Sequence, residues 1–116
     1  MIMEFDEIAD FRKDLKKLLK RYRSLHDDLS VIRKTLGVEP DADPPFSFRI
    51  EGLRIKTCII KVRKMSCKSL KNRGVNSGLR LIYAYFKEDP RIVFIEIYHK
   101  NDKPLEDRAR IVKYFK

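Results

Sequence analysis

Residues 79–98 read LRLIYAYFKEDPRIVFIEIY, and this stretch decides the fold. Its two apolar runs, 79–86 and 92–98, are rich in β-branched and aromatic residues, which predicts two neighbouring strands. The intervening KEDPR has the composition of a hairpin turn. Because both runs are apolar at nearly every position, we expect them at the centre of an antiparallel sheet that is covered on at least one face.

The residues before this hairpin predict a short strand and two helices. Residues 2–5 are expected to form an edge strand. From Asp6, the expected N-cap, apolar residues recur at helical spacing as far as Tyr22. A second helix is predicted between Ser24, the first residue of a capping box, and Gly37, the expected C-cap. Two helices joined by so short a connection form an antiparallel hairpin.

Near residue 48 the sequence period changes from that of helices to that of strands. The Pro- and Asp-rich residues 39–47 are predicted as a loop, and residues 55–63 as a strand. A last helix is expected to begin near Asp102 and Pro104, with Leu105 on its inner side. The order β-α-α-β-β-β-α predicts an α+β fold in two layers. We expect a single domain over residues 1–116, in which the helices pack with an antiparallel sheet and leave one sheet face free.

The composition excludes several classes of protein. Hydrophobic residues make up 43% of the chain, enough for a core, and no apolar run approaches the roughly 20 residues of a membrane helix. Cys58 and Cys67 are expected to be free thiols, and with two distant histidines they form no zinc signature. No motif of a serine hydrolase, zinc protease, P-loop or dinucleotide-binding enzyme occurs, so we expect neither a metal nor a cofactor. The acidic start is unlike a signal peptide, and we expect a cytoplasmic protein.

The net charge of +10 is concentrated in one segment of the chain. Residues 49–80 carry ten Lys or Arg and one acidic residue, whereas basic and acidic residues nearly balance elsewhere. Such a concentration is typical of a surface that binds a polyanion, here RNA, or an acidic protein. A solvated basic loop with no partner is the alternative that charge alone leaves open.

Three cations of the central strands are candidates for binding a phosphate. Lys61 and Arg63 share one face of their strand, because side chains alternate along it. Arg80 stands within an apolar strand, where its charge needs an anion or a hydrogen-bonding partner. The alternatives are ordinary exposed strand cations for Lys61 and Arg63, and a structural ion pair with Glu96 for Arg80.

The other candidates follow the last strand or lie in the basic loop. Tyr98, His99 and Lys100 bring a phenol, an imidazole that can titrate near neutrality and an amine to one strand end. The alternatives are a strand-end cap for His99 and a core aromatic for Tyr98. The loop supplies further cations for an RNA backbone: Lys64, Lys68, Lys71 and Arg73.

An ordered set of motifs resembles the RelE/ParE toxin superfamily. The segment SGLRLIY, residues 77–83, is similar to the family's central motif, which reads YRLVY or HRLVY. The basic strand with Lys61 and Arg63, and the last strand that ends in His99 and Lys100, resemble their counterparts in the family. The order of the predicted elements is also that of the family, so the resemblance covers nearly the whole chain.

The resemblance implies a toxin of a type II toxin–antitoxin module. RelE-like members are ribosome-dependent mRNA endonucleases, whereas ParE-like members inhibit DNA gyrase. By resemblance, Arg80 corresponds to the family's phosphate-stabilising arginine, and Tyr98 and His99 correspond to its terminal Tyr-His region. The sequence departs from the family at Asn101, where an arginine is frequent, and at Asp107, where a functional tyrosine is expected.

The leading hypothesis is therefore an mRNA interferase that cleaves ribosome-bound mRNA without a metal. Arg80 and Arg63 would bind the phosphate, Lys61 would be the general base and His99 the general acid, with Lys100 and Tyr98 as substitutes. The expected partners are mRNA on the ribosome and an acidic, partly disordered antitoxin. Two alternatives stay open: a ParE-like gyrase inhibitor, and a non-catalytic RNA- or protein-binding module on the same fold.

Overall fold

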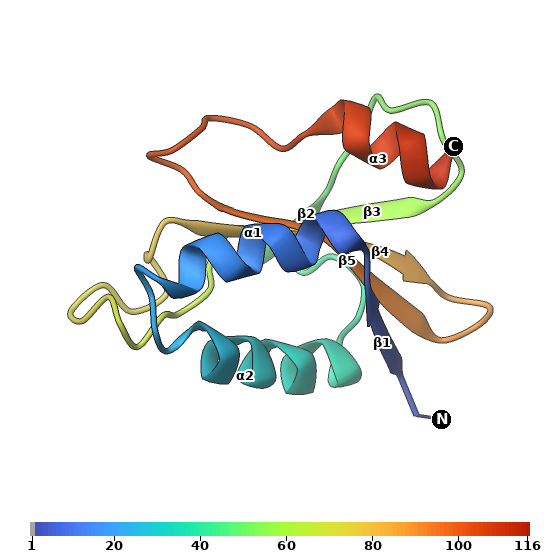
Figure 1. Ribbon diagram of the computed structural model, residues 1–116. Coiled ribbons are helices and arrows are strands. Elements are labelled where there is room, and N and C mark those ends of the chain that lie inside the picture. Colours follow the sequence, from blue (N-terminus) through green and yellow to red (C-terminus); the bar gives the residue numbers. More distant parts are fainter. Residues whose placement is uncertain (1) are drawn as a thin grey trace.

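The computed structural model describes residues 2–116, which form five strands and three helices. The strands are β1 (Glu4–Glu7), β2 (Ser47–Arg49), β3 (Cys58–Val62), β4 (Leu79–Phe86) and β5 (Arg91–His99). The helices are α1 (Ala9–Leu19), α2 (Leu25–Val38) and α3 (Arg108–Phe115). All strands lie in one sheet, in the order β1-β5-β4-β3-β2 (Figure 1). The predicted α+β class is confirmed.

The hairpin of β4 and β5 lies at the centre of the sheet, as its apolar sequence predicts. Strands β2 to β5 are antiparallel neighbours, and β1 pairs in parallel with β5 at one edge. At the other edge, β2 begins within the segment predicted as a loop, and its Phe48 lies opposite Lys61. Three residues are too few to show a period of two, so the sequence pattern could not indicate this strand.

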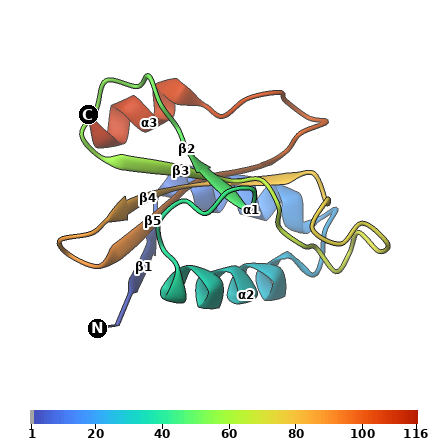
Figure 2. The ribbon, with the colours of Figure 1, turned by 180° about the vertical axis from the view of Figure 1, so that it is seen from behind.

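Helices cover both faces of the sheet, whereas the sequence predicted one free face (Figures 1 and 2). On one face α1 and α2 close a large apolar core that includes Phe11, Leu29 and Tyr83. On the other face Ile111 of α3 packs in a smaller core with Ile82. The expectation of a free face is wrong for much of the sheet, because the alternate side chains of β4 and β5 are also apolar and need a cover.

Two predicted helix ends are displaced. Asp6 is part of β1 rather than an N-cap, because parallel pairing with β5 continues the first strand to Glu7. Gly37 lies inside α2 rather than after it, since the helix continues to Val38. The sequence therefore predicted both helices, but sheet pairing and packing moved their ends by a few residues.

The last helix starts later than predicted. Asp107 is its N-cap and accepts a hydrogen bond from the Arg110 N–H at 3.0 Å. Leu105, predicted to face inwards, precedes the helix and is 61% exposed. The residues between β5 and α3 instead cross the sheet as an irregular segment.

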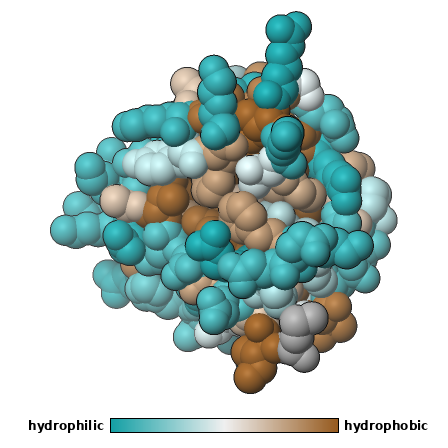
Figure 3. All heavy atoms as spheres, turned by 90° about the vertical axis from the view of Figure 1, so that its right-hand side faces the viewer, coloured by the Kyte–Doolittle hydropathy of each residue, from teal (hydrophilic) through white to brown (hydrophobic). Residues whose placement is uncertain are grey.

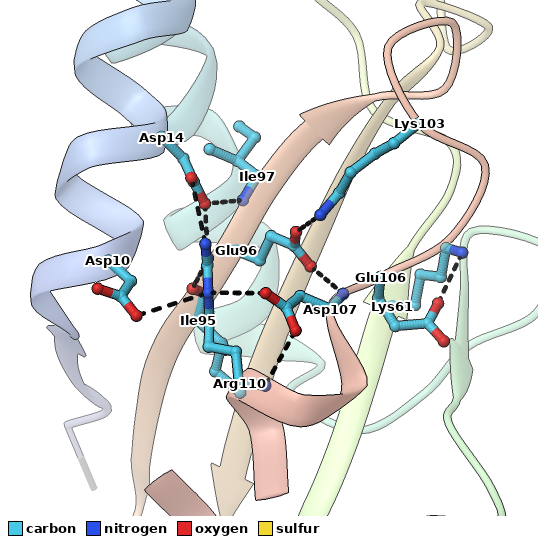
Figure 4. Close-up of polar contacts among 10 residues, drawn as sticks. All are labelled: Asp10, Asp14, Lys61, Ile95, Glu96, Ile97, Lys103, Glu106, Asp107 and Arg110. Carbon is cyan, nitrogen blue, oxygen red and sulfur yellow. Dashed lines mark hydrogen bonds and ion pairs between the residues drawn. The ribbon is translucent and has the colours of Figure 1, made fainter. Parts of the chain in front are cut away.

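Arg110 of α3 joins three elements through a polar network (Figure 4). Its guanidinium donates to Asp14 of α1 at 2.7 Å and to the Ile95 carbonyl of β5 at 2.9 Å. Asp14 also accepts the Ile97 N–H at 3.4 Å. Because β1 pairs only with residues 91–94, these side chains satisfy the part of the β5 edge that β1 does not reach. Burial lowers the pKa of Arg110, but the bond to Asp14 and the negative charges of Asp14, Glu96 and Asp10 together outweigh burial and raise it.

The end of the molecule that carries the N-terminus has a mostly hydrophilic surface, with apolar side chains gathered beside the terminus (Figure 3). Among the most exposed apolar residues are Ile2, which is 90% exposed, and Val38, which is 88% exposed.

In the part of the chain that the structure describes, no helix has both the length and the apolar character needed to cross a membrane.

We expect Arg110→Met to lower the free energy of unfolding by about 1–3 kcal/mol, because Asp14 and the Ile95 carbonyl would lose their donor in a partly buried site. Arg12→Met is the matched control. The Arg12–Glu7 ion pair spans 3.9 Å and the Arg12 side chain is 61% exposed, so its loss should cost about 0–1 kcal/mol. Urea denaturation followed by circular dichroism measures both values, and equal losses would contradict the role of Arg110.

Candidate nucleic-acid interface

A pocket with a volume of about 250 Å³ lies where the ends of β3, β4 and β5 meet the loop 63–78. We call it the basic pocket, because four cations line it: Arg63, Lys64, Arg80 and Lys100. Its other lining residues are Pro45, Phe48, Asn76 and Gly78. Among the described residues 2–116, no acidic residue lines this pocket. The pocket therefore has the charge and the position of an anion site at the end of a sheet.

Arg80 is held in the basic pocket by backbone contacts. Its Nη1 donates to the Arg63 carbonyl at 3.0 Å. Glu96, the alternative partner considered from the sequence, is instead bound by Lys103 and by the Asp107 N–H, so the Arg80–Glu96 pair does not form. Burial lowers the pKa of Arg80 and the charge of Arg63 lowers it further, while Tyr98 opposes this shift. A bound anion would relieve both unfavourable effects.

The other three cations are the consecutive residues Arg63 and Lys64, which follow β3, and Lys100, which follows β5. The Arg63 guanidinium lies 5.8 Å from the centre of the Phe48 ring. Lys64 donates to the Asn76 side-chain oxygen at 2.8 Å. Lys100 is exposed, and its N–H donates to the Gly78 carbonyl at 2.9 Å. The basic pocket thus unites most of the predicted phosphate-binding residues, although no local motif specifies it.

Lys61 lies beside the basic pocket but is engaged in an ion pair. Its Nζ donates to Glu106 Oε1 at 3.0 Å, and its side chain is 15% exposed (Figure 4). Arg108 donates to the second oxygen of Glu106 at 2.9 Å. The Lys61 amine is thus engaged by a buried carboxylate and does not line the basic pocket. The contact therefore favours an electrostatic role for Lys61 over the predicted role as a base.

His99 and Tyr98 are buried, and neither lines the basic pocket. His99 Nδ1 accepts the Asn101 N–H at 3.1 Å, so Nε2 is the protonated nitrogen and donates to the Ser77 carbonyl at 3.0 Å. Both ring nitrogens are engaged, which fits the alternative of a strand-end cap better than a general acid. The Tyr98 hydroxyl is buried and has no hydrogen-bond partner within the described residues 2–116.

The loop 63–78 is anchored to the fold and extends beyond the sheet at the end opposite the β4–β5 turn (Figure 2). Met65 and Cys67 are buried in the core under α1 and α2. The remaining loop cations singled out from the sequence are exposed and lie outside the basic pocket: Lys68, Lys71 and Arg73. Contact between these cations and RNA stays a prediction.

Two residues of this region were missed in the sequence. Phe48 belongs to β2, which was not predicted, so its face could not be assigned. Glu106 stands among other charged residues near the C-terminus, and no local spacing distinguishes it. Because β2 has only three residues, the sequence around Phe48 shows no alternation long enough to indicate an edge strand.

A mixed five-stranded sheet with an N-terminal helical hairpin on one face and a C-terminal helix on the other defines a RelE-like fold. The structure is similar to a chain of the archaeal RelE–RelB complex from Pyrococcus horikoshii OT3, with a TM-score of 0.59 and 17% identity over 89% of this chain and 100% of that chain. It is also similar to an arginine double mutant of the E. coli toxin RelE in the free state, with a TM-score of 0.56 and 16% identity over 89% and 88%. No family model and no curated protein matches the sequence. The resemblance is confirmed for the fold.

We expect Gly78→Ala to destabilise the protein by about 1–3 kcal/mol. Gly78 has a φ of +88°, and a Cβ there would lie 2.6 Å from His99 Nε2, so backbone strain adds to a clash. Gly37→Ala is the control, because a Cβ there meets nothing within 4 Å and helix propensity should raise stability by roughly 0.5–1 kcal/mol. Thermal melts of both variants provide the test, and an unchanged Gly78→Ala melt would refute the described packing.

The Glu106 ion pair predicts a pH-dependent contribution to stability. Burial raises the pKa of Glu106, but hydrogen bonds from Lys61, from its own backbone N–H and from Arg108 outweigh burial and hold this pKa below its usual range. The folded state therefore binds the proton more weakly than the unfolded chain. The contribution is complete above the ordinary glutamate pKa of about 4.3 and is lost as the pH falls through the lower, folded-state value.

Glu106→Gln should thus be less stable than the wild type at pH 7, by about 1–3 kcal/mol, and this deficit should shrink below about pH 4. Urea titrations of both proteins at several pH values measure the difference. Asp89→Asn, in the exposed β4–β5 turn, is the control for removing a carboxylate. A deficit that stays constant across the pH range would contradict the lowered pKa.

Proposed function

We propose that this chain is an mRNA-cleaving toxin of a type II toxin–antitoxin module. The observation that carries the proposal is Arg80: it is partly buried, lies beside Arg63 and donates to backbone carbonyls in place of a carboxylate. Such an arrangement suits a phosphate that gains negative charge during a reaction. The RelE-like fold supports the same proposal, because the sequence resemblance that assigned Arg80 to the phosphate also predicted this fold.

The chemistry proposed is transfer of the phosphodiester to the neighbouring ribose hydroxyl. A base removes the proton of the 2′-OH, O2′ attacks phosphorus, the bond to the 5′-oxygen breaks, and an acid protonates that oxygen. The transition state carries extra charge on the non-bridging oxygens. Arg80 and Arg63 would stabilise this charge, and Lys61, fixed by Glu106, would add to the positive potential.

Lys100 is the acid that the geometry favours. Its side chain is exposed and lines the basic pocket, whereas His99 is buried with both ring nitrogens engaged. Tyr98, the other predicted substitute, has a hydroxyl without a partner among the described residues, but it is buried and does not line the basic pocket. Lys100 would donate its proton to the leaving 5′-oxygen.

The proposed partners are mRNA on the ribosome and an antitoxin. A concentration of ten cations against one acid in residues 49–80 suits an RNA backbone, and it also suits an acidic antitoxin segment that would compete for the same surface. The similar archaeal chain belongs to a RelE–RelB complex. By analogy, we propose a cognate antitoxin that covers the basic pocket.

A non-catalytic RNA-binding module is the second candidate. It is favoured by the engagement of Lys61 with Glu106 and of His99 with Ser77 and Asn101, which removes two predicted proton-transfer groups from the basic pocket. This candidate and the toxin make the same forecast for RNA binding. They differ in whether ribosome-bound mRNA is cut.

Arg80→Ala should fold normally but lose about 100- to 1000-fold in cleavage rate, the usual effect of removing one preorganised donor. Growth after induction and primer-extension mapping of mRNA ends measure the effect in cells. Arg91→Ala is the matched control, because Arg91 is also a strand arginine, but it lies at the far end of β5 opposite Phe86.

Three outcomes separate the candidates. Cleavage by the wild type and by Arg91→Ala but not by Arg80→Ala supports the proposed function. Wild-type rates in Arg80→Ala would contradict the role of Arg80. RNA binding without any cleavage by the wild type on ribosomes would contradict the toxin proposal in favour of the binding module.

A further inference from the structure

Phe48 is a large apolar side chain at the mouth of the basic pocket. It lies in the edge strand β2, lines the basic pocket together with Pro45, and is 37% exposed. In the sheet register it stands opposite Lys61, so the two side chains share one face. The Arg63 guanidinium lies 5.8 Å from the centre of its ring.

Core packing does not account for an aromatic residue at this position. Phe48 belongs to neither apolar core of the described residues, whereas its neighbour Phe46 packs against the core under α1 and α2. The backbone pairing of β2 with β3 would be equally served by a polar residue, which is more usual at an exposed edge. The ring instead offers a flat apolar surface next to a cluster of cations.

We propose that Phe48 is the stacking platform of a nucleobase subsite in the basic pocket. One unpaired base of a single-stranded RNA lies on the Phe48 ring, with the Arg63 guanidinium beside it, while Arg80 and Lys100 bind the adjacent phosphates. This inference rests on the proposed function and extends it: it assigns the residue that orients the nucleotide whose phosphate the arginines bind.

The chemistry of the pocket matches a nucleotide better than a bare phosphate or a peptide. Aromatic rings and guanidinium planes are the groups on which unpaired bases stack, and stacking tolerates any base because each has a π face. Lys64 donates to the side-chain oxygen of Asn76. The two N–H groups of the Asn76 side-chain amide are therefore available as donors in the same pocket. A duplex would not fit this subsite, because its bases are already stacked on one another.

The chain provides a direct reporter for this subsite. It contains no tryptophan, so Phe48→Trp introduces a single indole at the proposed platform. A base that stacks on this indole should quench its fluorescence. The probes are a short single-stranded RNA and a base-free ribose-phosphate chain of equal length and charge.

We expect the RNA to quench Phe48→Trp and the base-free chain to leave its fluorescence nearly unchanged. Phe48→Leu keeps an apolar side chain but has no aromatic face. It should bind the RNA roughly 5- to 150-fold more weakly than the wild type, the range for one base–aromatic stack, and bind the base-free chain equally well. Tyr114→Leu is the matched control, since Tyr114 is 41% exposed and Lys113 lies 5.4 Å from its ring centre. This variant should bind both probes as the wild type does.

The failure of this inference can be told apart from that of the proposed function. If the wild type binds and cuts RNA while Phe48→Leu retains wild-type affinity, or loses the same factor on both probes, the stacking subsite is wrong and the proposed function stands. If the wild type binds neither probe, both are wrong. Thermal melts confirm that each variant is folded before binding is compared.

Discussion

The contact of Arg110 with Asp14 and with the backbone of β5 is the constraint on which the C-terminal part of the structure depends. The helix that carries Arg110 has eight residues and buries one of them, Ile111. A helix of this length is not stable by itself, and burying one such side chain contributes only about 1.5–3 kcal/mol. Phe115 adds a partly buried contact with the same core, and the polar contacts that Arg110 makes with α1 and β5 hold the helix against the sheet. The same contacts satisfy the edge of β5 where β1 ends.

Anchoring of α3 fixes the course of the segment that precedes it, and this segment carries carboxylates over one face of the sheet. Glu106 engages Lys61, and Glu96 of β5 engages Lys103 from the same segment. Arg80 and Arg63 lie beyond these carboxylates, at the ends of their strands. The tertiary structure thereby divides the basic residues of the chain into cations that are neutralised by internal partners and cations that face a pocket. This division is what turns a high net charge into a local anion site.

The hairpin of β4 and β5 could be predicted from sequence because its signal is local: two long apolar runs and a turn. The same reasoning identified Arg80, since an arginine inside an apolar strand must have a special environment. Local reasoning failed where a distant partner decides. The sequence assigned Lys61 to the correct face of its strand. It could not indicate the partner of Lys61, because Glu106 is 45 residues away in the chain. His99 was chosen for its chemistry, and the sequence gives no sign that its ring lies against Gly78 and is bonded to the Ser77 carbonyl.

By itself, the sequence determined the class of the fold, the central hairpin and the segment in which positive charge is concentrated. These follow from side-chain periodicity and composition, which act over a few residues. Only the tertiary structure decided that α3 covers the second sheet face, that β2 exists and that Phe48 stands beside Arg63. Each of these depends on pairing between segments that are far apart in the chain. The burial of a side chain and the pairing of its charge depend on neighbours from several such segments, so no local pattern of residues can predict them.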